Sequence, residues 1–200
     1  MAFRKKAEFI LAHKPDILIV QECEHPDKLK FNIGPLKPSD ILWFGTNQNK
    51  GFGIFSYSNF KFKLLHIHNP EIKMVIPIEV TGKNFDFTLF AIWANNPSDR
   101  DGQYVEQVWK ALHYYDTQLN SKQTILIGDF NSNTIWDHLP GRLSSHSEVV
   151  RQLENKGIFS TYHFFHKQAQ GSEKHGVVCA TQGTSRPHTG HASIHGDCAF

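Results

Sequence analysis

Two short stretches of this sequence decide its fold, and each is an apolar run that leads directly into polar side chains. Residues 15–22 read Pro-Asp-Ile-Leu-Ile-Val-Gln-Glu, and residues 124–131 read Thr-Ile-Leu-Ile-Gly-Asp-Phe-Asn. Short apolar runs of this kind are typical of strands buried within a sheet, so strands are predicted over 16–20 and 124–127. The glycine before Asp129 would let the chain turn and bring this carboxylate to the edge of that sheet.

Strand and helix patterns alternate through the rest of the chain as far as residue 174. Apolar residues and helix-ending signals predict three helices, over 3–13, 101–120 and 145–156. Further strands are predicted over residues 41–44, 53–57, 62–66, 74–80 and 85–93. Many strands with interspersed helices favour an α/β fold in which two sheets pack face to face, with the helices outside.

The composition is that of one folded domain. The chain has 200 residues, of which 40% are hydrophobic and 20% are charged, and this excludes a disordered or collagen-like protein. No apolar stretch approaches the roughly 18 residues that a membrane span needs. A net charge of +2 is too small to indicate nucleic-acid binding by itself. The three cysteines are odd in number and lack metal-site spacing, so we expect a reducing, cytoplasmic location.

The sequence changes character near residue 174. From His175 onward there is no Lys or Glu, and Phe200 is the only aromatic residue. A stretch with so little apolar surface offers little to offset the entropy of ordering it. We therefore expect a first domain over residues 1–174 and an atypical tail over residues 175–200. The tail is either a disordered terminus or the product of a shifted reading frame.

Polar side chains at the ends of the two decisive strands indicate a candidate metal site. Open α/β sheets bind ligands just beyond their strand ends, where side chains from different strands converge. Glu22 and Asp129 are oxygen donors of the kind that a hard cation such as Mg²⁺ prefers. The ordinary alternative is that both acids lie in helix caps or solvated turns and that Asn131 is a turn residue. The residues alone leave both interpretations open.

Motifs in these stretches resemble those of the endonuclease/exonuclease/phosphatase family, which contains deoxyribonuclease I, abasic-site endonucleases, inositol polyphosphate phosphatases and neutral sphingomyelinases. Residues 15–22 resemble its PDIL-x-x-QE motif, and residues 128–131 resemble its GDFN motif. Residues 50–56 are similar to the strand after its KGG motif, and residues 157–163 fall where members carry a GL-x-D segment. The order and spacing fit over residues 3–174. The resemblance implies a four-layer α/β/β/α sandwich with the active site at one edge of the paired sheets.

The resemblance also implies a role for each matching residue. Glu22 would be the ligand of Mg²⁺, with Mn²⁺ as an alternative ion. Asp129 would orient or deprotonate the attacking water, and Asn131 would hold that water or the phosphate. Trp93 and Asn96 occupy the place of a substrate-binding loop, although many members have Tyr at the position of Trp93, and core packing is the ordinary alternative for this tryptophan.

The sequence departs from the family pattern at both ends. The first strand, with its Asn, and the final Ser-Asp-His segment are missing, so we expect a member truncated at both ends, with weak or undetectable turnover. The implied function is Mg²⁺-dependent hydrolysis of a phosphodiester or phosphomonoester, as in a nuclease or phosphodiesterase. The alternative is a catalytically inactive fragment that acts at most as a binding module. The expected partner is a phosphoester, with DNA, RNA, a lipid head group and a small ester all open, and the oligomeric state is not predicted.

Overall fold

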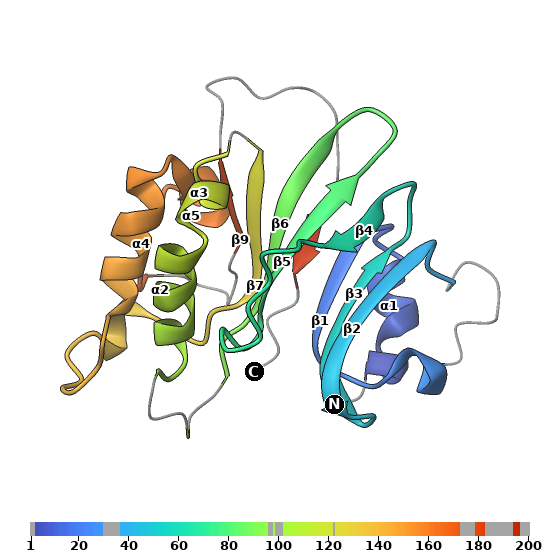
Figure 1. The fold of residues 1–200 in the computed structure, drawn as a ribbon, viewed down its shortest axis with the longest axis horizontal. Helices are drawn as coiled ribbons and strands as arrows, with labels where there is room; N and C mark the ends of the chain where they lie inside the picture. The colour runs from blue at the N-terminus through green and yellow to red at the C-terminus, as the bar shows by residue number, and fades with distance from the viewer. Residues whose placement is uncertain are drawn as a thin grey trace.

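The two strands predicted from the decisive stretches lie in different sheets. A computed structural model describes residues 3–29, 37–95, 98, 102–121 and 123–172, together with the strands at 179–182 and 194–196. In the described chain, two β-sheets pack against each other and each carries helices on its outer face (Figure 1). The layers therefore follow the order α/β/β/α.

The first sheet has the strand order β10-β1-β3-β2, and the second has the order β4-β5-β6-β7-β9-β8. The strands of the first sheet are β1 (Ile17–Cys23), β2 (Asp40–Asn47), β3 (Lys50–Ser56) and β10 (Ile194–Gly196). The strands of the second sheet are β4 (Lys61–Leu64), β5 (Val75–Thr81), β6 (Asp86–Trp93), β7 (Thr124–Asp129), β8 (Ile158–Ser160) and β9 (Cys179–Gln182). The pairs β1–β3, β2–β3, β4–β5 and β5–β6 are antiparallel, whereas β6 and β7 run parallel.

Helices form the outer layers. The α-helices are α1 (Ala7–Leu11), α2 (Val105–Tyr114), α3 (Asp116–Leu119), α4 (His146–Asn155) and α5 (Thr161–His166). Short 3-10 helices are η1 (Phe3–Lys5), η2 (Pro26–Lys28) and η4 (Thr134–Trp136). α1 packs on the first sheet, while α2 and α4 pack on the second (Figure 1).

Successive side chains along the central strands point alternately into two different hydrophobic cores, one on each face of the sheet. Ile17 and Ile19 of β1 belong to the core between the sheets, whereas Leu18 belongs to the core under α1. In β6, Leu89 joins the core between the sheets and Phe90 joins the core under the helices. This period of two is the pattern of a strand that is buried on both faces, and it explains why the two decisive stretches are so uniformly apolar.

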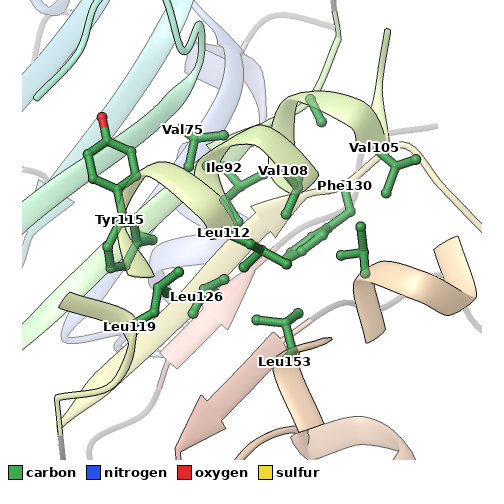
Figure 2. Packing of buried hydrophobic residues seen from close by; sticks show 14 of the residues in the cluster. Val75, Ile92, Val105, Val108, Leu112, Tyr115, Leu119, Leu126, Phe130 and Leu153 are labelled. Carbon is green, nitrogen blue, oxygen red and sulfur yellow. The ribbon is translucent and has the colours of Figure 1, made fainter. Parts of the chain in front are cut away.

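The core between the second sheet and its helices is formed by side chains of the sheet and of the helices that cover it. Figure 2 shows Val108 and Leu112 of α2, Leu126 of β7 and Leu153 of α4 in one cluster. Each fully buried side chain of this type contributes about 1.5–3 kcal/mol relative to its exposed state. Tyr115 closes one end of the cluster, and its hydroxyl accepts a hydrogen bond of 3.0 Å from the backbone N–H of Asn69.

The α/β sandwich predicted from the sequence is confirmed, and each predicted strand is present. Two helix predictions need correction. The helix predicted over 3–13 is a 3-10 turn followed by the short α1, and the helix predicted over 101–120 divides into α2 and α3 at Tyr115, which leaves helical geometry at this buried position. β8 and α5 were not predicted, because elements this short carry little periodic signal.

Within the predicted tail, the structure describes only β9 and β10. β9 pairs antiparallel with β7 and β8, and β10 pairs parallel with β1. The rest of residues 175–200 lies outside the described residues, so the domain boundary near 174 stays a prediction. Within the part of the chain that the structure describes, no helix combines the length and apolar character that a membrane crossing requires.

Candidate active site at the edge of the two sheets

A single buried glutamine connects the two sheets near the end of β1. Gln21 follows Ile17 and Ile19 in the period of two, so its side chain faces the second sheet. There its Nε2 donates a hydrogen bond of 3.4 Å to the carbonyl oxygen of Ile92 in β6. Because Glu22 is the next residue, this contact fixes the end of β1 beside the end of β6.

The same carbonyl oxygen lies against Gly128 of β7. Gly128 pairs with Ile92 in the parallel β6–β7 ladder and has a φ of +138°, a conformation that side chains rarely adopt. A Cβ atom at this position would lie only 2.0 Å from the Ile92 oxygen. Glycine therefore lets β7 pass close enough to β6 to deliver Asp129 to the same edge.

The backbone turns sharply at Glu22. Its φ is +54°, in the left-handed region that few residues other than glycine adopt. The pairing of β1 with β3 also shifts register between Val20 and Cys23, which is the signature of a bulge. Bulges re-aim a side chain, and here the Glu22 carboxylate is half-exposed at the edge of the sheet.

Asp129 ends β7 opposite Trp93 of β6, and Asn131 follows it in a tight turn. Asn131 has a φ of +45°, and its backbone N–H donates a hydrogen bond of 2.8 Å to Asp129 Oδ1. Burial raises the pKa of the Asp129 carboxyl above its usual value; hydrogen bonds from Asn131 oppose the rise, and the negative charge of Glu22 adds to it. β1 and β7 contact each other although they belong to different sheets, so the two carboxylates come from adjoining strands.

Lys50 completes this edge with a positive charge. Its Nζ lies 2.7 Å from Glu22 Oε1 and 5.8 Å from the centre of the Trp93 ring. Trp93 is only 5% exposed, and its ring packs 6.2 Å from that of Phe52 in the core between the sheets. The site thus combines two carboxylates, one ammonium group and one amide with the aromatic ring of Trp93.

The donor atoms suit a hard divalent cation. Glu22, Asp129 and Asn131 offer carboxylate and amide oxygens, which Mg²⁺ prefers, and Mg²⁺ commonly uses one or two carboxylates and keeps several waters. The described residues contain no group of three or more His, Cys, Asp or Glu side chains that could enclose a metal ion. An open site fits this donor set better than a closed cage.

Four of the five residues singled out in the sequence lie at this edge: Glu22, Trp93, Asp129 and Asn131. The fifth, Asn96, lies outside the described residues. Both acids belong to the last residues of their strands rather than following them.

Sequence reasoning missed two residues of the site, Gln21 and Lys50. Gln21 follows Ile17 and Ile19 at intervals of two residues, so its side chain points to the same face of β1. The sequence alternation could therefore have predicted that Gln21 is buried. Lys50 opens the strand that resembles the family motif, but its pairing with Glu22 depends on a bulge that the sequence does not reveal.

Comparisons with known proteins identify the fold. No protein-family model matches the sequence, and no curated protein matches it either. Among solved structures, an AP endonuclease from Archaeoglobus fulgidus has a TM-score of 0.58 and 15% identity, over 90% of this chain and 83% of that one. This chain has the endonuclease/exonuclease/phosphatase fold.

Two further structures support that assignment. The 3' phosphatase NExo from Neisseria, bound to a product DNA hairpin, has a TM-score of 0.55 and 16% identity, over 90% of this chain and 81% of that one. TDP2 from D. rerio, complexed with a single-strand DNA product, has a TM-score of 0.51 and 16% identity, over 92% of this chain and 78% of that one. The endonuclease/exonuclease/phosphatase fold implied by the two motifs is thereby confirmed.

The close approach at Gly128 predicts a large loss of stability on Gly128→Ala. We expect a loss of at least about 3 kcal/mol, because a strained backbone and a clash with the Ile92 carbonyl add together. Gly141→Ala is the matched control, since Gly141 also has a positive φ of +77° but nothing lies within 4 Å of its added Cβ. That variant should lose only about 1 kcal/mol. Urea unfolding measures both, and equal losses would contradict the assigned role of the close approach.

The raised pKa of Asp129 predicts a pH-dependent effect of Asp129→Asn on stability. With the folded pKa above the unfolded value of about 4, the carboxyl costs no stability below that value and destabilises the fold increasingly as the pH rises through the folded pKa. The asparagine variant should therefore be more stable than the parent near neutral pH and about equally stable near pH 3. Urea midpoints at the two pH values, with Asp27→Asn as an exposed control, measure this difference. A gain that is the same at both would show that the charge is not its cause.

Proposed function

We propose that this protein hydrolyses phosphoesters with the help of a divalent metal ion bound at the edge described above. The observation that carries this proposal is the convergence of Glu22 and Asp129, which come from strands of different sheets that contact each other. A fold places two carboxylates together at an electrostatic cost, and such costs concentrate at functional sites. The left-handed backbone at both Glu22 and Asn131 supports the same interpretation.

Each side chain has a chemical task in this proposal. Glu22 would hold Mg²⁺ or Mn²⁺, which when bound neutralises charge on the phosphoryl oxygens and stabilises the leaving oxygen. Asp129 accepts the proton of the attacking water, a task favoured by a carboxyl whose pKa lies above the usual range. Asn131 donates its amide hydrogens to the water or to a phosphoryl oxygen without repelling the negative charge of the substrate.

Nucleic acid is the substrate class that the surroundings favour. The segment that leaves the site carries Ile135 and Trp136, both exposed apolar side chains on the 3-10 helix η4. Exposed aromatic rings offer a stacking surface to unpaired bases. Asn133 and Asp137 hold this segment in place: Asn133 Oδ1 accepts from the backbone of Ile135, and the carboxylate of Asp137 accepts from two backbone N–H groups at the start of α4.

The remaining predicted contacts are part of the same proposal. Trp93 forms the floor of the substrate site, where its ring lies beneath the ammonium group of Lys50. Asn96, three residues beyond the end of β6 in the sequence, would contact phosphate. NExo and TDP2, which share the fold, were captured with DNA products, and this supports nucleic acid as the first substrate to test.

The proposal predicts hydrolysis that depends on both Mg²⁺ and Asp129. The purified chain is incubated with bis-(p-nitrophenyl) phosphate and with nicked or abasic DNA, with and without Mg²⁺. Asp129→Ala should lower the rate on the order of 10²-fold or more, because it removes the group that accepts the proton. Asp27→Ala, whose side chain is 84% exposed in η2, should leave the rate unchanged.

The same assay separates the proposal from its alternative. Background rates from the parent and from Asp129→Ala alike would contradict hydrolysis and favour an inactive binding module. Retention of DNA on the unmodified protein in a filter assay would then measure the binding that such a module requires.

A further inference from the structure

Lys50 is the charged group of the candidate site to which neither the sequence motifs nor the proposed reaction assigns a role. It is the first residue of β3, and its side chain reaches across the edge of the first sheet toward the second. Its Nζ contacts Glu22 Oε1 at 2.7 Å and lies 5.8 Å from the centre of the Trp93 ring. The ammonium group is therefore located between a carboxylate of one sheet and an aromatic ring of the other.

We propose that Lys50 is a built-in cation that competes with the divalent metal ion for Glu22 and binds the substrate's phosphoryl group once the metal ion has displaced it. This inference rests on the proposed function, because it assumes that Glu22 holds the metal ion. It assigns Lys50 two successive partners, first the carboxylate and then the phosphate. No bond to carbon or phosphorus changes in this exchange.

Geometry makes the competition unavoidable at one oxygen atom. An ammonium group 2.7 Å from Glu22 Oε1 occupies the space that a metal ion would need in order to coordinate that atom. The like charges of Lys50 and the metal ion would also repel each other at such a distance. Metal coordination at Glu22 Oε1 must therefore move the Lys50 side chain away from that atom.

Displacing Lys50 from Glu22 costs little free energy, because both side chains of this ion pair are exposed. The side chains of Lys50 and Glu22 are 55% and 52% exposed, and exposed ion pairs are weak because water screens them. The face of Trp93 offers a second attraction for the cation, so the displaced ammonium group stays near the site. From this position beside Trp93, the ammonium group can contact the negatively charged oxygens of a bound phosphoester.

A second lysine provides a matched control. Lys63 of β4 pairs with Glu79 of β5 at 3.4 Å, and both side chains are exposed. Lys63→Met removes the same charge from a strand-borne lysine–glutamate pair. Glu79 lies opposite Thr88 near the start of β6, whereas Trp93 and Asp129 of the candidate site end β6 and β7.

The first measurement is Mn²⁺ binding, followed by the loss of the free-ion signal in electron paramagnetic resonance. Lys50→Met should bind Mn²⁺ about threefold to tenfold more tightly than the parent, because the metal ion no longer has to break an exposed ion pair. Lys63→Met should match the parent, and Glu22→Gln should bind most weakly. Unchanged or weaker binding by Lys50→Met would overturn the inference.

The second measurement is the binding of inorganic phosphate at saturating Mg²⁺, by isothermal titration calorimetry. Here Lys50→Met should bind about threefold to tenfold more weakly than the parent, the opposite direction from its effect on the metal ion. A residue that only supports the fold would change both affinities in the same direction, and that result also overturns the inference.

These experiments distinguish failure of the inference from failure of the proposed function. If Mn²⁺ binding depends on Glu22 but not on Lys50, the metal site stands and the role of Lys50 is wrong. If the parent, Lys50→Met and Glu22→Gln all bind Mn²⁺ equally weakly, the metal site itself is wrong, and the inference fails with it.

Discussion

The carbonyl oxygen of Ile92 is the point on which the arrangement of this site depends. It accepts a hydrogen bond from Gln21, which belongs to the other sheet, and it lies against the bare α-carbon of Gly128 in the neighbouring strand. Three strands from two sheets are thereby held at one atom. Glu22 and Asp129 each follow one of these contacts by a single residue, so the contacts that join the sheets also set the positions of the two acids.

Bringing two carboxylates to one edge has a cost that the surrounding groups reduce. The negative charge of Glu22 adds to the burial that raises the pKa of Asp129, while hydrogen bonds from Asn131 act against the rise. Lys50 places a positive charge at 2.7 Å from Glu22 and so reduces the repulsion within the pair. The strained backbone at Glu22 and at Asn131 persists because the packed strands on either side leave the chain no alternative.

Much of the fold could be predicted from the sequence, because apolar residues recur along it at the spacings of strands and helices. The uniform apolar character of residues 17–20 and 124–127 reflects strands that are buried on both faces. Because Glu22 and Asp129 come shortly after these runs, the runs also indicated where the two acids lie. The partner of Glu22 could not be predicted in this way. Its contact with Lys50 depends on a register shift between Val20 and Cys23, and β1 ends at Cys23, so too few residues follow the shift to show a change of phase in the sequence. Short elements such as α5 carry too little pattern to be found.

The charge balance of the edge has a consequence for how such a site would work. Two carboxylates and an amide leave much of a metal ion's coordination to water and substrate, so the binding of the ion is weak by itself and sensitive to each neighbouring charge. Lys50 is the nearest such charge to Glu22 among the described contacts. An ammonium group that opposes the metal ion and attracts the phosphate would favour the arrival of both together over the arrival of the ion alone. In that case substrate binding and metal binding would depend on each other through Lys50.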